Sequence, residues 1–158
     1  MKNIFRKNIS KIYKYSKIYD ECFWLNKFIN TNSISLILDV GANTGQYASS
    51  LRRFGYKKKI ISFEPGKDAY SELIKNSKKD NQWRVFEKIA LGNKSGSKKL
   101  NISKNSVSSS FRVINEIHLV HELNAKYIKN ELSKIIKLDG IFKKFYKKDK
   151  NIMLKIDT

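Results

Sequence analysis

The chain has 158 residues, of which 41% are hydrophobic, so the sequence can form one packed core and a wholly disordered chain is excluded. Its 33 lysine and arginine residues against 14 acidic residues give a net charge of +19, a balance typical of proteins that contact nucleic acid or an anionic membrane. The single cysteine, Cys22, excludes an intramolecular disulfide, and no apolar run approaches the ~20 residues of a membrane span, so we expect a soluble, cytoplasmic protein.

The positive charge has a second explanation besides a nucleic-acid partner. Lysines are spread along the whole chain, from Lys2 to Lys155, as a composition that favours lysine would also produce. Arginine, which binds phosphate and guanine through paired hydrogen bonds, occurs at five positions: Arg6, Arg52, Arg53, Arg84 and Arg112. Nucleic-acid binding is therefore an alternative hypothesis and not the leading one.

The first 33 residues are predicted to form a helical extension. Between residues 4 and 29, apolar side chains recur at steps of three and four with lysines between them, which predicts an amphipathic helix or helix pair. Such a helix packs on the main domain or lies on an anionic membrane surface, and both interpretations are open. Residues 30–33 are polar and predict a linker, so the main domain is expected over residues 34–158.

From residue 36 the pattern alternates between strands and helices. Residues 36–40 form a short apolar run without alternation, as in a strand buried on both faces of a parallel sheet. A helix is expected over residues 46–54, a strand over 60–63, a helix over about 67–78 and a third strand over 85–89. This order gives two right-handed βαβ crossovers. We therefore expect an α/β fold of the Rossmann-like, doubly wound type, with a mostly parallel sheet and helices on both faces.

Beyond Gly92 the expected elements are shorter. Residues 93–97 have the composition of a turn, 98–103 of a short strand and 105–110 of a serine-rich loop. A helix is expected within residues 116–129, a short strand over 135–137 and a short helix over 138–146. Residues 152–157 again have the pattern of a buried strand.

The motif with the most chemical content is Asp39-Val40-Gly41-Ala42-Asn43-Thr44-Gly45, where the first strand meets the first helix. Gly41 allows a tight turn and the close approach of a ligand, and Gly45 allows the helix to begin close to the sheet. The helix N-terminus favours an anionic group. Asn43 occupies the middle glycine of a dinucleotide fingerprint, and no Gly-Lys-Ser/Thr follows, so a dinucleotide and a P-loop are both disfavoured.

An acidic residue, Glu64, ends the second strand 19 residues after Gly45. In this fold a carboxylate at that place reaches the two hydroxyls of a ribose. Pro65 favours an extended backbone at Glu64 and so helps to aim its side chain over the edge of the sheet. The turn and this carboxylate together favour a ligand site over the structural alternative, a tight turn capped by Asp39 with a solvated charge at the strand end.

With these motifs the chain resembles the FkbM-type family of S-adenosylmethionine-dependent methyltransferases. The resemblance rests on residues 39–47, 63–65, 89–92 with Ser95 and Gly96, 108–110 and 154–157, in that order. It implies methyl transfer to a hydroxyl, often that of a sugar or a natural product. By resemblance, Asp39, Gly41, Asn43 and Gly45 would line the methionine end of S-adenosylmethionine, Glu64 its ribose and Ala90 the neighbourhood of its adenine.

The acceptor side is expected near the last strand. Asp157, at the carboxyl end of that strand, is placed to face the methyl group or the acceptor, with Lys155 two residues earlier on the same side of the strand, and we hold both as candidate catalytic residues. Ser109 is a candidate substrate contact. His118 and His121 lie three residues apart, but no third ligand is in register with them, so no metal site is predicted.

The sequence departs from the family at its end. Family members continue past the Lys-x-Asp strand with a glycine, an acidic residue and further strands and helices, whereas this sequence ends at Thr158. We therefore expect a partial methyltransferase domain whose last strand lies at a sheet edge. The leading function is O-methylation of a sugar or small-metabolite hydroxyl. The alternatives are an inactive truncated remnant or interaction module, and a nucleic-acid methyltransferase.

Overall fold

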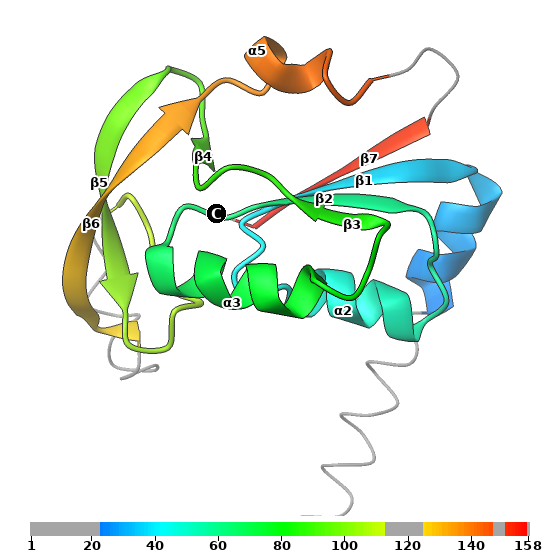
Figure 1. Cartoon of the computed structure of the whole chain (residues 1–158), viewed down its shortest axis with the longest axis horizontal. Coiled ribbons are helices and arrows are strands. Elements are labelled where there is room, and N and C mark those ends of the chain that lie inside the picture. Colours follow the sequence, from blue (N-terminus) through cyan, green and yellow to red (C-terminus); the bar gives the residue numbers. More distant parts are fainter. Residues whose placement is uncertain (1–22, 113–124, 147–150, 158) are drawn as a thin grey trace, which may run out of the picture.

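A four-stranded parallel sheet forms the centre of the molecule, and a three-stranded sheet stands beside its carboxyl edge (Figure 1). The computed structural model describes residues 23–112, 125–146 and 151–157. The central sheet has the order β3 (Trp83–Val85), β2 (Lys59–Phe63), β1 (Ile34–Val40) and β7 (Asn151–Ile156). All of its neighbouring strands are parallel, so their carboxyl ends meet along one edge.

Helices cover both faces of this sheet (Figure 1). The helices α2 (Gln46–Arg53) and α3 (Lys67–Ser77) lie on one face, and α5 (Asp139–Phe142) lies on the other. Each inner strand is apolar on both sides: Ile37 and Ile60 pack in the cluster under α2 and α3, while Leu38 packs in the cluster with α5. This explains why residues 36–40 form a continuous apolar run, and it confirms the predicted α/β fold.

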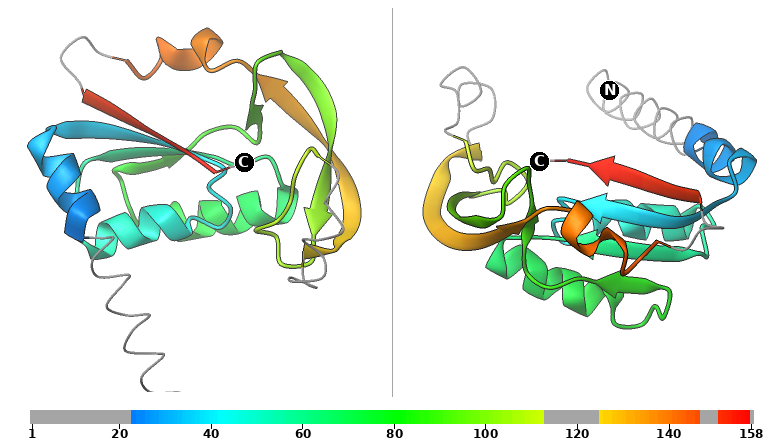
Figure 2. Two further views of the ribbon diagram at one scale, coloured as in Figure 1. Left: turned by 180° about the vertical axis from the view of Figure 1, so that it is seen from behind. Right: turned by 90° about the horizontal axis from the view of Figure 1, so that it is seen from above.

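The second sheet has the order β4 (Ala90–Leu91), β6 (Tyr127–Ile136) and β5 (Gly96–Ser103). The strands β4 and β6 are parallel, and β5 and β6 are antiparallel. The long, curved ribbon of β5 and β6 faces the carboxyl edge of the central sheet in all three views (Figures 1 and 2). The two sheets therefore enclose the place where the sequence motifs meet.

Residues 23–31 are helical, and this helix packs on the sheet through Leu25 and Ile29, while most of its other residues are exposed. Ile29 is buried in the cluster that holds Ile37, Ala48 and Leu51. The predicted linker is therefore too long: the helix continues through residue 31, and only residues 32 and 33 form a turn before β1. Residues 1–22, which carry most of the predicted amphipathic helix, lie outside the described residues, and the domain boundary at residue 33 stays a prediction.

Three predicted elements differ from the structure. The third strand spans Trp83–Val85 and not residues 85–89, because the chain leaves the sheet after Val85 and buries Phe86 and Ile89 on its way to β4. The helix predicted over 116–129 is wrong for residues 127–129, which pair with β5, and its residues 116–124 lie outside the described part of the chain. The helix predicted over 138–146 is shorter, Asp139–Phe142.

The predicted strand over 98–103 is confirmed within β5. Of the strand predicted over 152–157, residues 152–156 lie in β7, and Asp157 follows its end. The short strand predicted over 135–137 is the end of the longer β6. In the described residues β7 has one strand neighbour, β1, so it lies at an edge of the sheet. Within residues 23–112, 125–146 and 151–157, the helices are too short or too polar to cross a membrane.

Candidate functional site

The site is built on the turn that joins β1 to α2. Three residues of this turn have left-handed backbone conformations: Gly41 with φ 73°, Asn43 with φ 50° and Gly45 with φ 94°. The N–H groups of Gly41 and Ala42 both donate to the carbonyl of Phe63, over 3.1 and 3.0 Å. These bonds fix the turn to the end of β2, the strand that carries Glu64.

Gly45 lies directly over the core. A Cβ atom at this position would lie 2.6 Å from the ring of Trp83 and 2.9 Å from Leu73, closer than real contacts allow. The absence of a side chain therefore lets α2 begin against the sheet, as the spacing of the motif predicted. Gly45 does not line the cavity described below.

Glu64 joins the two loops at the carboxyl edge. One of its oxygens accepts a hydrogen bond from the backbone N–H of Asn43 (2.7 Å), and the other accepts one from the N–H of Gly66 (2.8 Å). Glu64 is only 8% exposed. Burial raises the pKa of its carboxyl, and the two N–H donors partly offset this rise. Each carboxylate oxygen keeps a second lone pair, so Glu64 can still accept hydrogen bonds from two ligand hydroxyls.

A row of polar side chains runs beneath the turn, from β3 to β7. The indole N–H of Trp83 donates to Ser62 (3.0 Å), Ser62 donates to Asp39 (3.3 Å), and the Nζ of Lys155 lies 3.1 Å from Oδ1 of Asp39. Asp39 is fully buried; burial raises the pKa of its carboxyl, and the Lys155 ammonium opposes this rise. We call this set of four residues the polar row.

Lys155 and Asp39 thus support the turn from below. The Nζ of Lys155 donates to the carbonyl of Gly41 (3.3 Å) and lies 5.3 Å from the ring centre of Tyr47. Neither Lys155 nor Asp39 lines the cavity. The predicted contact of Asp39 with a ligand and the catalytic role of Lys155 stay predictions; the structure places both side chains behind the turn.

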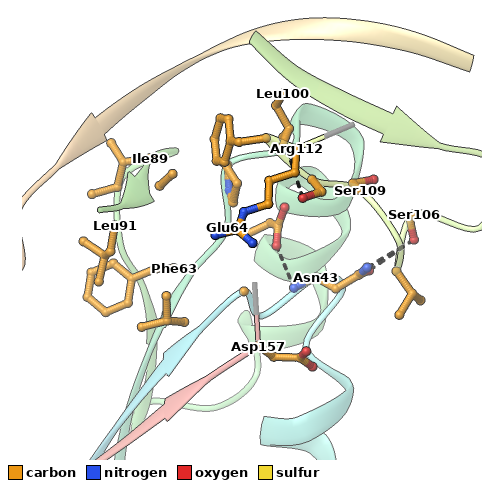
Figure 3. A pocket seen from close by; sticks show the side chains of 17 residues that line it. Asn43, Phe63, Glu64, Ile89, Leu91, Leu100, Ser106, Ser109, Arg112 and Asp157 are labelled. Carbon is orange, nitrogen blue, oxygen red and sulfur yellow. Dashed lines mark hydrogen bonds between the residues drawn. The ribbon is translucent and has the colours of Figure 1, made fainter. Parts of the chain in front are cut away.

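A cavity of about 350 Å³ lies above the turn, between the two sheets (Figure 3). Its volume is within the range of small-molecule sites. Six of the nine residues that the sequence singled out line it: Gly41, Asn43, Glu64, Ala90, Ser109 and Asp157. The tertiary fold thus brings together the first turn, the end of β2, β4, the serine-rich loop and the end of β7.

Asp157 lies at the open side of this cavity. Its side chain is 77% exposed and lies 3.6 Å from the Nζ of Lys155, while its backbone N–H donates to the carbonyl of Val40 (3.0 Å). That backbone bond extends the pairing of β7 with β1 and places the carboxylate beside the turn. An exposed carboxylate next to a cavity can accept a proton from a ligand hydroxyl.

The serine-rich loop, residues 105–110, closes another side of the cavity. Ser106 exchanges hydrogen bonds with the side chain of Asn43, with the Nδ2 to Oγ distance at 3.2 Å, so the loop and the first turn touch. The hydroxyl of Ser109 accepts a hydrogen bond from the N–H of Ser103 (3.1 Å). Ser109 therefore stabilises the loop at the cavity wall, and its predicted contact with substrate stays a prediction.

Sequence reasoning missed the far wall of the cavity. Leu100 of β5, together with Phe111 and Arg112 after the serine-rich loop, lines the side opposite to the first turn. Their part in the site depends on how β5 and β6 curve over the central sheet, which no local pattern reveals. For Arg112 a sequence signal existed, because it is one of five arginines and comes two residues after the serine-rich loop.

The described residues contain no group of three or more His, Cys, Asp or Glu side chains that could hold a metal ion. His118 and His121 lie outside the described part of the chain. The site that the structure does describe has instead the polar groups of a small-molecule site: backbone N–H groups, one amide, hydroxyls and a few charges.

Comparison with known proteins identifies the family. The family model described as the methyltransferase FkbM domain matches residues 39–158, which begin with Asp39 at the first turn and include every residue that lines the cavity. A search of curated proteins gives no match. Since the family model covers more than half of the chain, the chain belongs to the FkbM methyltransferase family.

Proposed function

We propose that the cavity binds S-adenosylmethionine and that the protein transfers its methyl group to a hydroxyl of a sugar or another small metabolite in the cytoplasm. The observation that carries the proposal is Glu64, whose buried carboxylate lies at the cavity and keeps a free lone pair on each oxygen. A pair of vicinal ribose hydroxyls matches these acceptors. Gly41, with no side chain, leaves room for the methionine part of the donor beside the turn.

In this proposal the adenine of the donor lies against Ala90 and its neighbours. Ala90, Ile89 and Leu91 line the cavity with apolar atoms, and Phe63 adds an aromatic ring. A flat, mostly apolar base is favoured by such a surface. Asn43 and Gly41 remain for the amino-acid part, next to the N-terminus of α2, whose partial positive charge favours a carboxylate.

When bound, the donor supplies an electrophilic methyl group: its bond to the acceptor oxygen forms as the bond to sulfur breaks, and the sulfur keeps the electron pair. The protein's part is to hold the acceptor hydroxyl in line and to take up its proton. Asp157 is the group we propose for the proton, because its carboxylate lines the cavity and its exposure lets the proton pass to solvent afterwards.

The test is calorimetric titration of the full chain with S-adenosylmethionine. We expect binding that Glu64→Ala weakens at least tenfold, because two hydrogen bonds to a charged group are lost. Glu64→Gln should also weaken binding, since an amide offers one acceptor oxygen where two backbone N–H donors and two hydroxyls need acceptors.

The matched control is Glu87→Gln, which removes the same charge from an exposed residue outside the cavity and should leave the dissociation constant unchanged. Circular dichroism of each variant shows that the fold persists. If the folded wild-type chain binds no S-adenosylmethionine, or if the Glu64 variants bind it as well as wild type does, the proposal is wrong.

A further inference from the structure

The backbone of Arg112 is held firmly at the rim of the cavity. Its carbonyl accepts hydrogen bonds from the Nδ2 of Asn101 (3.0 Å) and the hydroxyl of Tyr127 (2.9 Å), and its N–H donates to the Oγ of Ser110 (3.2 Å). Asn101 and Ser110 also exchange two backbone hydrogen bonds. Strands β5 and β6 thus fix the point from which the Arg112 side chain starts.

The Arg112 side chain itself has no such attachment within the described part of the chain. No hydrogen bond or ion pair there involves its guanidinium, although the cavity lining also contains two acidic residues, Glu64 and Asp157. Figure 3 shows the side chain directed into the cavity. Among the described lining residues it is the only cation. Arg112 is an exposed residue at this rim, so its side-chain donors are open to a ligand in the cavity, while its backbone stays fixed.

The choice of arginine at this position indicates the chemical class of the ligand. A guanidinium is always protonated and offers a planar fork of N–H donors that fits the two oxygens of a carboxylate or a phosphate. The chain is rich in lysine, which carries a point charge without this geometry, yet the cavity holds an arginine. The three other arginines in the described residues, Arg52, Arg53 and Arg84, do not line the cavity.

We propose that Arg112 binds an anionic group, a carboxylate or a phosphate, on the hydroxyl compound that accepts the methyl group. The acceptor is then a sugar acid, a sugar phosphate or a similar anionic hydroxyl compound and not a neutral sugar. This inference rests on the proposed methyl transfer for its acceptor. Arg112 acts as a specificity residue: it pairs with the anion at its own wall of the cavity, and through that pair it orients the acceptor hydroxyl toward the methyl group of the donor.

The experiment compares matched probes on the full chain. D-Glucuronate, D-glucose 6-phosphate and the neutral D-glucose are each titrated into the protein by calorimetry at constant ionic strength. Each titration is done with and without saturating S-adenosylhomocysteine. We expect at least one anionic probe to bind wild type about tenfold or more tightly than glucose. In Arg112→Gln this preference should fall to less than threefold, whereas Arg84→Gln, which removes the same charge from an exposed residue outside the cavity, should keep it.

Several results would overturn the inference. The first is that neither anion binds. The second is that Arg112→Gln keeps the preference for the anion over glucose. The third is that Arg84→Gln loses this preference to the same extent, which would indicate that net charge alone attracts the anions. A fourth is that Arg112→Gln weakens the binding of S-adenosylhomocysteine but not that of 5′-methylthioadenosine, which lacks the amino-acid part. Arg112 would then bind the carboxylate of the donor. Failure of S-adenosylhomocysteine to bind contradicts the proposed donor, while the titrations without it still decide the role of Arg112.

Discussion

Asp39 is an acidic residue that solvent does not reach, and the Lys155 ammonium, 3.1 Å from its Oδ1, stabilises the charged form of the carboxyl. Removing one partner of a buried pair leaves the other charge uncompensated, which costs more than the pair contributes. The sequence motif identified Asp39 and Lys155 separately. Their pairing was not predictable, because it follows from the parallel register of β1 and β7, which sets Asp39 beside Lys155.

The variant Lys155→Met should therefore be destabilised most at neutral pH. We expect a loss of about 3 kcal/mol in the free energy of unfolding at pH 7, the lower end for a buried pair because Lys155 is partly exposed. Without the ammonium the pKa of Asp39 rises further, so the native state holds a proton that the unfolded chain, with a pKa of about 4, releases. The stability of the variant then falls as the pH rises through this raised pKa.

Urea unfolding at about pH 4.5 and pH 7.5 measures this difference. The control is Lys75→Met, which breaks an exposed ion pair with Glu72 and should change stability by less than about 1 kcal/mol at either pH. An equal loss for Lys155→Met at both pH values would show that Asp39 is not the group responsible.

Glu64 was the site residue that the sequence predicted most fully. Its position at the end of a buried strand and before a proline fixes both its place and its direction, and the structure has it at the cavity. The sequence did not reveal the second role of Glu64, which is structural. By accepting hydrogen bonds from Asn43 and Gly66, Glu64 also holds the two loops together, a role that depends on the close approach of β1 and β2.

At the scale of elements, local sequence patterns predicted the secondary structure of segments that are buried on both faces. They failed for segments whose secondary structure depends on pairing with distant strands. The strands and helices from β1 to α3 follow their apolar periodicity. Lys129 and Glu131, by contrast, lie in a strand: Lys129 pairs with Asp68 (2.7 Å), and Glu131 accepts a hydrogen bond from the N–H of Lys67 (2.8 Å) at the start of α3. These contacts and the pairing with β5 select the strand, and neither is visible in a short window.

The start of α2 depends on the missing side chain of Gly45. We expect Gly45→Ala to lower the free energy of unfolding by about 2–4 kcal/mol, because the new methyl meets Trp83 and the residue must also keep a φ of 94°. Gly55→Ala is the matched control: its φ is 91°, but nothing lies within 4 Å of the added methyl. It should lose only about 1 kcal/mol, the strain of the backbone alone.

Urea unfolding of the two variants isolates the packing contribution as the difference between them. If both glycine variants lose the same free energy, the contact between the turn and Trp83 has no role in stability. A larger loss for Gly55→Ala would contradict the close fit of α2 against the sheet.

At the scale of the whole molecule, the central sheet was predictable and the enclosure of the cavity was not. The order of motifs along the chain identified the edge of the sheet at which Gly41, Glu64 and Asp157 meet. The opposite wall comes from β5 and the residues after the serine-rich loop, whose position depends on the curvature of the second sheet. The family match covers both parts, since it extends from residue 39 to 158.

The polar row also gives the molecule a natural optical probe. The chain has two tryptophans: Trp24 is 61% exposed, while Trp83 is 6% exposed, touches the position of Gly45 and donates to Ser62. In Trp24→Phe, the remaining indole emission should be blue-shifted and resistant to iodide quenching. Binding of S-adenosylmethionine at the turn should change its intensity, and Trp83→Phe should abolish the response.

A response that persists in Trp83→Phe would place the change at Trp24 and contradict this expectation. With Trp83 alone emitting, the fluorescence reports the environment directly below the turn, without any attached dye. A ligand that binds at the turn can then be followed in real time through the emission of a single buried indole.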